Sequence, residues 1–207
     1  MLIEQPPTFF RRLFPAARFR MPEKVGDERT VYLTFDDGPS KYTKKLLNLF
    51  DQYHIQSTFF VVGENVKRYP KIIDQMIERG HVIGNHSYTH INFKTHSIHE
   101  INDEIQKSED LLKKHNYMPY LLRPPYGAIN PKLQTNYTII LWNNDSLDWK
   151  LKEKKAIIKQ VTSNLKENQI ILFHDLYPTT IEAMEELIPL LLSKGYYFQP
   201  IYQKKGL

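Results

Sequence analysis

Val31-Tyr32-Leu33-Thr34-Phe35-Asp36-Asp37-Gly38-Pro39 is the most informative segment of the chain. Its first five residues are rich in β-branched and aromatic side chains, which is typical of a buried strand. Two carboxylates and a Gly-Pro pair then end the run in a turn. Polar residues that directly follow a strand lie where α/β proteins place their active sites. The segment therefore predicts a strand and a functional site at its C-terminal end.

Further β-rich runs follow this strand, and amphipathic helical patterns separate most of them. The runs cover residues 57–62, 81–85, 119–122, 137–142, 169–174 and 196–201. The helical patterns centre on residues 46–53, 72–77, 98–105, 157–165 and 181–191. Strands that alternate with helices predict a parallel α/β fold. A full eight-unit barrel takes about 250 residues, so we expect a distorted, incomplete (β/α) barrel, TIM-like, with about seven parallel strands; an open doubly wound sheet is the alternative.

Composition and charge exclude several classes of protein. The 207 residues are 41% hydrophobic and 25% charged, which fits one well-buried domain. We expect residues 1–30 to form an irregular lead-in across the barrel and residues 31–207 to form the domain itself. The net charge of +5 is modest and its lysines are spread along the chain, so no nucleic-acid partner is expected. Cysteine is absent, so any metal must be bound by His, Asp or Glu.

The sequence predicts neither a signal peptide nor a membrane span. Arg and Pro interrupt the apolar residues of the N-terminus, and no apolar run approaches the length of a bilayer-spanning helix. The cellular location is therefore undetermined; it would be cytoplasmic unless an export segment is missing from this sequence.

His86 and His90 are candidate metal ligands. On a helical turn their spacing of four would place both imidazoles on one face, where they could bind one ion. Two unrelated surface histidines are the simpler interpretation of such a pair on its own. Asp37 supplies a carboxylate that would complete a set of two His and one Asp, with positions left for water and substrate.

Four further residues are candidates for the chemistry of the site, and two of them, Asp36 and His174, also have a structural interpretation. Asp36 either caps an Asp-Gly turn or acts as a general base beside the metal. His174 either is a buried structural histidine or donates a proton to a leaving amine. An imidazolium needs a carboxylate partner, for which Asp148 is a candidate. Arg123 is expected to hold Asp36 through a bidentate ion pair.

The chain resembles the polysaccharide deacetylase family, also called the NodB-homology domain or carbohydrate esterase family 4. The resemblance runs from about Val31 to near the C-terminus. It rests on five motifs that occur in the family's order: Thr34-Phe35-Asp36-Asp37-Gly38-Pro39, His86-Ser87-x-x-His90, Arg123-x-Pro125-Tyr126, Asp145-x-x-Asp148-Trp149 and Leu172-x-His174. Each motif alone is weak evidence, whereas five in order are specific.

The resemblance implies a role for each matching residue. It implies that Asp36 is the catalytic base and that Arg123 orients it. It implies that the backbone N–H of Tyr126 helps to hold the oxyanion and that Asp148 tunes the catalytic His174. It implies one divalent metal ion, zinc first and cobalt or another ion otherwise, held by Asp37, His86 and His90. It also implies a substrate groove that is lined by Pro125, Trp149 and Leu172 and receives the acetyl methyl group.

The implied reaction removes acetyl groups from an N-acetylglucosamine-containing glycan, giving a free amine and acetate. Peptidoglycan, poly-N-acetylglucosamine and chitooligosaccharides are the candidate substrates, and we expect a monomer whose partner is the acetylated glycan. An O-acetyl esterase acting on xylan and a catalytically silent glycan-binding homologue are alternatives. A non-heme iron oxygenase also uses two His and one carboxylate, but there the carboxylate is usually close to the first His, whereas Asp37 precedes His86 by a long interval.

Overall fold

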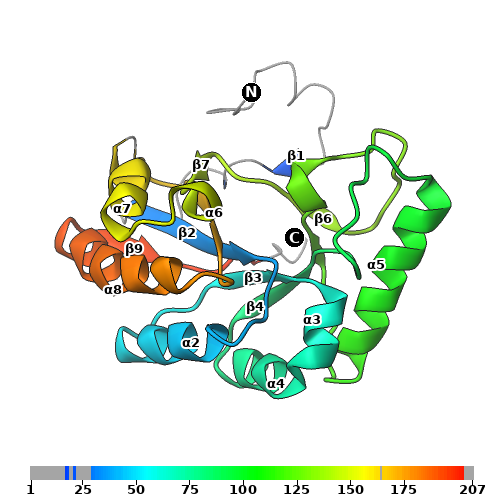
Figure 1. Cartoon of the computed structure of the whole chain (residues 1–207), viewed down its shortest axis with the longest axis horizontal. Coiled ribbons are helices and arrows are strands. Elements are labelled where there is room, and N and C mark those ends of the chain that lie inside the picture. The colour runs from blue at the N-terminus through cyan, green and yellow to red at the C-terminus, as the bar shows by residue number, and fades with distance from the viewer. Residues whose placement is uncertain (1–16, 19–20, 22–28, 164, 203–207) are drawn as a thin grey trace, which may run out of the picture.

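The computed structural model of the chain describes residues 17–18, 21, 29–163 and 165–202. Its strands are β1 (Ala17–Arg18), β2 (Arg29–Asp36), β3 (Thr58–Val61), β4 (Val82–Asn85), β5 (Leu121–Leu122), β6 (Thr138–Ile140), β7 (Asn144–Asp145), β8 (Ile170–His174) and β9 (Tyr196–Phe198). They pair in parallel in the order β1-β6-β5-β4-β3-β2-β8-β7, and β9 pairs with the first residues of β2. The sheet curls, with helices around its outside (Figure 1). The incomplete TIM-like barrel is confirmed, and the open doubly wound sheet is wrong.

The helices are α2 (Thr43–Gln52), α3 (Gly63–Arg68), α4 (Pro70–Glu78), α5 (Ile98–Lys113), α6 (Asp148–Leu151), α7 (Lys154–Thr162) and α8 (Pro178–Ser193). Five of them match the predicted patterns. Helices α3 and α6 were not predicted, because six and four residues are too few to establish an apolar stripe. Within the described part of the chain, no helix is long and apolar enough to cross a membrane.

The alternation of β2 separates a core from a site. Leu33 and Phe35 lie in the apolar layer between sheet and helices, where Phe35 stacks on Phe59 and Phe173 at 5.3 and 5.6 Å. Successive side chains of a strand point to opposite faces. Thr34 and Asp36 therefore face the inside of the barrel, and the same period applies to β8.

The inside of the barrel is apolar at one end and polar at the other. A separate cluster of buried hydrophobic side chains fills part of the interior; its members are Tyr32, Phe60, Val82, Leu121, Ile140, Ile170 and Ile201. The buried polar residues Thr34, Asp36 and Arg123 lie further along the same strands or directly after them. The packed interior thus supports a polar floor at the C-terminal ends of the strands, as in barrel enzymes.

Two segments differ from the sequence-based expectation. The cluster at residues 145–149 does not follow the strand predicted at 137–142: that strand ends at Ile140, and the chain crosses to β7, which pairs with β8 at the other end of the sheet order. Ala17–Arg18, within the predicted lead-in, forms a strand parallel to β6. Most of residues 1–30 lies outside the described residues, so the division at residue 31 stays a prediction.

Candidate active site

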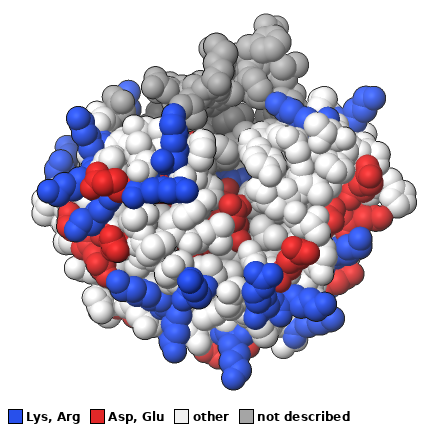
Figure 2. All heavy atoms as spheres, in the orientation of Figure 1, with Lys and Arg blue, Asp and Glu red and all other residues white. Residues whose placement is uncertain are grey.

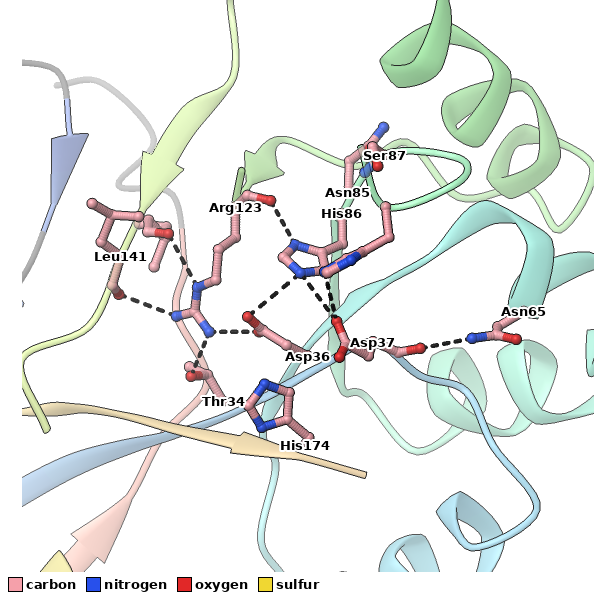
Figure 3. Close-up of polar contacts among 12 residues, drawn as sticks. Thr34, Asp36, Asp37, Asn65, Asn85, His86, Ser87, Arg123, Leu141 and His174 are labelled. Atoms are coloured by element: carbon pink, nitrogen blue, oxygen red, sulfur yellow. Dashed lines mark hydrogen bonds and ion pairs between the residues drawn. The ribbon is translucent and has the colours of Figure 1, made fainter. Parts of the chain in front are cut away.

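The two adjacent aspartates at the end of β2 turn to different partners. Asp36 is the last residue of the strand, and Asp37 has left-handed backbone dihedrals, with φ of 70°. The side-chain amide of Asn65 donates to the Asp37 carbonyl at 2.8 Å and holds this turn. As Figure 3 shows, the Asp37 side chain faces His86, while the Asp36 side chain lies between His86 and Arg123.

Asp37, His86 and His90 converge on one point. Asp37 Oδ1 lies 3.3 Å from His86 Nε2 and 3.1 Å from His90 Nε2, and the three ligand atoms all lie within 4.8 Å of one another. Their spacing of four suggested a helical turn, but the histidines do not lie on one. They lie on the loop after β4, where Ser87 and His90 have left-handed φ values of 63° and 62°. The backbone bends there so that both rings face Asp37.

The donor set fits a divalent cation. His86 Nδ1 lies 2.6 Å from the carbonyl oxygen of Arg123, which can only accept, so Nδ1 carries the proton and Nε2 presents a lone pair. Asp37 Oδ1 is buried and has no hydrogen-bond donor among the described residues. Two lone pairs that face each other at this distance repel unless a cation lies between them. Two imidazole nitrogens and one carboxylate oxygen are ligands that zinc accepts.

Arg123 fixes the second aspartate. Its fully buried guanidinium donates through Nη1 to Asp36 Oδ1 at 2.6 Å and to Thr34 Oγ1 at 2.9 Å. Nε and Nη2 donate to the carbonyl oxygens of Ile140 and Leu141, both at 3.1 Å. The predicted bidentate pair is therefore wrong, because two of the guanidinium nitrogens are used by backbone oxygens. The remaining Asp36 oxygen is left facing the candidate metal ligands, 3.7 Å from His86 Nε2.

His174 and Asp148 form a second, separate pair. His174 ends β8 directly beside Asp36 in the register of β2 and β8. Its Nδ1 lies 2.7 Å from Asp148 Oδ1. Fully buried Asp148 also accepts hydrogen bonds from the backbone N–H of His174, the Thr180 hydroxyl and the backbone N–H of Trp149, at 2.7, 2.7 and 2.8 Å. Burial lowers the pKa of His174, but the hydrogen bond and charge of Asp148 outweigh it and raise the pKa to about 9.

Asp175 packs against the turn that carries Asp37. Its fully buried carboxylate accepts a hydrogen bond from the Thr43 hydroxyl at 2.5 Å, and its Oδ1 has no donor among the described residues. It packs so closely on Gly38 that a Cβ at that position would clash with it. Burial raises the pKa of Asp175 to about 7, and the nearby charge of Asp37 acts in the same direction.

The predicted groove residues divide into exposed and buried ones. Tyr126 and Trp149 are 66% and 42% exposed, and the Tyr126 ring contacts that of His90 at 4.6 Å between centroids. Leu172 and Pro125 are buried, so they can form only the floor of a groove. Figure 2 shows a hollow near the centre of this face, with acidic atoms on its floor and basic side chains around the periphery.

Sequence reasoning missed three polar partners of these residues. Thr34 and Thr180 bind Arg123 and Asp148, and Glu104 accepts hydrogen bonds from the loop between His86 and His90. Thr34 stands within the first motif. Glu104 lies between Ile101 and Ile105 on the apolar stripe of α5, and that position could have indicated a buried carboxylate in need of partners.

Comparison with known proteins agrees with this geometry. Residues 23–138 match the family model described as polysaccharide deacetylase. The peptidoglycan-N-acetylmuramic acid deacetylase PdaC of Bacillus subtilis is 36% identical over 181 residues, which cover 86% of this chain and 39% of the relative. The peptidoglycan-N-acetylglucosamine deacetylase PgdA of Listeria monocytogenes is 32% identical over 202 residues, 95% of this chain and 43% of the relative. The chain thus spans about two fifths of the length of these relatives.

A solved structure shares the fold as well. The peptidoglycan deacetylase PdaC from Bacillus subtilis superposes with a TM-score of 0.82 at 36% identity, over 84% of this chain and 89% of that one. The family model, the relatives and the superposition point to the same family as the five sequence motifs. The chain belongs to the polysaccharide deacetylase family.

Proposed function

We propose that the chain is a metal-dependent N-deacetylase, which hydrolyses the acetamide of an N-acetylglucosamine-containing glycan to a free amine and acetate. One observation carries the proposal: a set of Asp37, His86 and His90 that could hold a cation lies beside a buried carboxylate and a histidine whose pKa is raised by its own carboxylate partner. Hydrolysis of an amide needs an electrophilic centre, a base for the attacking water and an acid for the leaving amine. Each requirement has its own group here.

Zinc is the proposed ion, with cobalt or another divalent ion as a substitute. Three protein ligands with open positions are the usual arrangement of catalytic zinc sites. Such an ion, when bound, lowers the pKa of water toward about 7 and polarises a carbonyl oxygen. His86 is set up for this role by its fixed tautomer, and His90 and Asp37 complete the set.

Asp36 is proposed as the general base. The Arg123 guanidinium at 2.6 Å stabilises the carboxylate and leaves its second oxygen available to take a proton from the attacking water. Water then adds to the acetamide carbon and places negative charge on the carbonyl oxygen. The backbone N–H of Tyr126 is proposed to stabilise that charge; removal of one such donor typically costs about 2.7–4 kcal/mol.

His174 is proposed as the general acid. Its imidazolium transfers a proton to the sugar nitrogen as the carbon–nitrogen bond breaks, and acetate leaves. Asp148 holds the ring through Nδ1 and stabilises the charged form. Asp36 has then gained one proton and His174 has lost one, so the two changes cancel. Proton exchange with water returns both residues to their starting states.

Peptidoglycan is the substrate that the comparisons favour, because the relatives are named for its N-acetylmuramic acid or N-acetylglucosamine units. Trp149, Leu172 and Pro125 are proposed to receive the acetyl group, with Trp149 as the exposed wall. We further propose that residues 31–207 make up the catalytic domain, with residues 1–30 as its lead-in.

Acetate release from N-acetylglucosamine oligomers tests the proposal. The metal-stripped protein is assayed with and without added zinc or cobalt, beside acetylated xylan as an ester substrate. Metal-dependent release from the amide is expected. Release from xylan alone would instead favour an O-acetyl esterase, and silence on both by a metal-loaded protein would favour a glycan-binding role.

A further inference from the structure

Glu104 of α5 binds the loop that carries both histidines. Its Oε2 accepts the backbone N–H groups of Tyr88 and Thr89 at 3.0 and 2.6 Å, and the Thr89 hydroxyl at 3.0 Å. These two residues stand directly before His90 in the chain. Glu104 itself is only 9% exposed. A buried carboxylate thus satisfies two successive peptide groups next to a candidate ligand.

The opposite side of the loop is bound by the start of α3. The backbone N–H groups of Gly63 and Glu64 donate to the carbonyl oxygens of Ser87 and Tyr88, both at 3.0 Å. A Cβ on Gly63 would lie only 2.5 Å from the Tyr88 ring, so the helix approaches the loop closely. Asn85 Oδ1 accepts the Ser87 N–H at 2.9 Å. The loop is therefore held between α3 and α5.

The two histidines depend on this support unequally. His86 has its own anchor, the Arg123 carbonyl at 2.6 Å, and its side chain is 2% exposed. The side chain of His90 is 25% exposed, and its backbone is left-handed, a conformation that residues with a Cβ disfavour. Without Glu104 the N–H groups of Tyr88 and Thr89 would lose their acceptor, and with it the hydrogen bonds that tie the segment directly before His90 to α5.

We propose that Glu104 is a positioning residue for the metal site, acting through the Tyr88–Thr89 peptides to hold His90 in ligand geometry. The inference rests on the metal site of the proposed function, but it does not depend on the substrate. Loss of a group that orients a ligand typically lowers metal affinity about 10–100-fold. The effect should therefore appear in binding of the ion alone.

The test measures the zinc and cobalt affinity of Glu104→Ala, Glu104→Gln and wild-type protein by competition with a chelator, without substrate. Glu104→Ala is expected to bind roughly 10–100-fold more weakly. Glu104→Gln keeps an acceptor of the same shape without its charge, so a smaller but measurable loss is expected. If the Ala variant does not fold, the Gln variant decides the question, and wild-type affinity in it would overturn the proposal.

Glu100→Ala is the matched control on the same helix. Glu100 forms the capping box with Ser97, so its loss weakens α5 while leaving the loop contacts in place. Wild-type metal affinity is expected in this variant; a loss equal to that of Glu104→Ala would mean general destabilisation and would overturn the proposal. His90→Ala provides the reference for a missing ligand. Wild-type protein that binds no tighter than His90→Ala would contradict the metal site itself, whereas tight wild-type binding with an unaffected Glu104→Ala would contradict only the role of Glu104.

Discussion

The metal side of the site (Asp37, His86 and His90) and its acid side (Asp148 and His174) differ in how their polar atoms are satisfied. Asp148 accepts hydrogen bonds from two groups of His174, from a threonine hydroxyl and from a backbone N–H. On the metal side, Asp37 Oδ1 has no donor among the described residues, and it faces an imidazole lone pair. The polar atoms of the acid side are satisfied by the chain itself, whereas those of the metal side would be satisfied by the cation of the proposed function.

The two sides also rest on different kinds of structure. His174 ends a strand that pairs with β2 along its whole length. His86 and His90 lie on a loop outside regular secondary structure. Because the two sides share no hydrogen bond among these residues, we infer that a variant on one side should leave the hydrogen-bonded geometry of the other unchanged.

The largest effect is expected from removal of a metal ligand. His86→Ala leaves an incomplete donor set, and the ion supplies several kcal/mol of transition-state stabilisation, so kcat/KM for acetate release should fall by at least about 10³-fold. His99→Ala, a surface histidine that pairs with Asp103 away from the site, should retain wild-type turnover. A His86→Ala protein with more than about a tenth of wild-type activity would contradict the assignment.

Removal of the acid is expected to cost less. His174→Ala should lower kcat by about 10²–10⁴-fold, which is the usual contribution of a positioned proton donor. Its zinc affinity should equal that of the wild type, because the acid side supplies none of the proposed ligands. A large loss of metal affinity would show that the two sides are not separable.

The pH dependence gives a smaller and directional effect. The pKa of His174 is raised from the ordinary histidine value of 6.5 to about 9. The pair with Asp148 therefore stabilises the fold fully below pH 6.5, and this stabilisation is lost as the pH rises through 9. Asp148→Asn removes the largest raising influence and should lower the pKa of His174 in an NMR titration. Because the protonated ring is the proposed acid, activity should fall as the pH rises through the pKa of His174. In Asp148→Asn, where that pKa is expected to be lower, the fall should begin at a lower pH. An unchanged or higher pKa in Asp148→Asn would be inconsistent with the proposed pair.

The smallest effect concerns the contribution of buried Asp175 to the stability of the fold. Burial raises the pKa of Asp175 from its usual 3.8 to about 7, so the stability present below pH 4 is lost as pH rises through 7, where the buried group must ionise. Asp175→Asn keeps the shape and does not ionise. The melting temperature of the variant relative to the wild type should therefore increase between pH 4 and 8. An unchanged difference, or one of opposite sign, would show that folding does not raise the pKa of Asp175.

The sequence predicted those parts of the site that follow long apolar strands. The runs that became β2 and β8 ended in Asp36 and His174, and parallel pairing alone brings such ends to one edge of a sheet. Strand β7 escaped prediction because two polar residues, Asn144 and Asp145, carry no β pattern. The location of Asp148 beside His174 could therefore be inferred from the family resemblance but not from the strand pattern.

Details set by tertiary contacts were beyond the sequence. The helical turn predicted for His86 and His90 was wrong because hydrogen bonds from α3 and α5 hold that loop in left-handed turns. The expected bidentate contact of Arg123 was wrong because carbonyl oxygens after β6 bind its other nitrogens. In both cases the structure places the residue at the candidate site, while its geometry depends on partners far away in the chain.

A crystal structure of the zinc-loaded protein, with the ion located by anomalous scattering, tests the metal assignment most directly. The account predicts one ion about 2.0–2.2 Å from Asp37 Oδ1, His86 Nε2 and His90 Nε2, with Asp36 outside the coordination shell and still bound to Arg123. An ion held by Asp36, or an ion bound elsewhere in a protein that remains active, would contradict it.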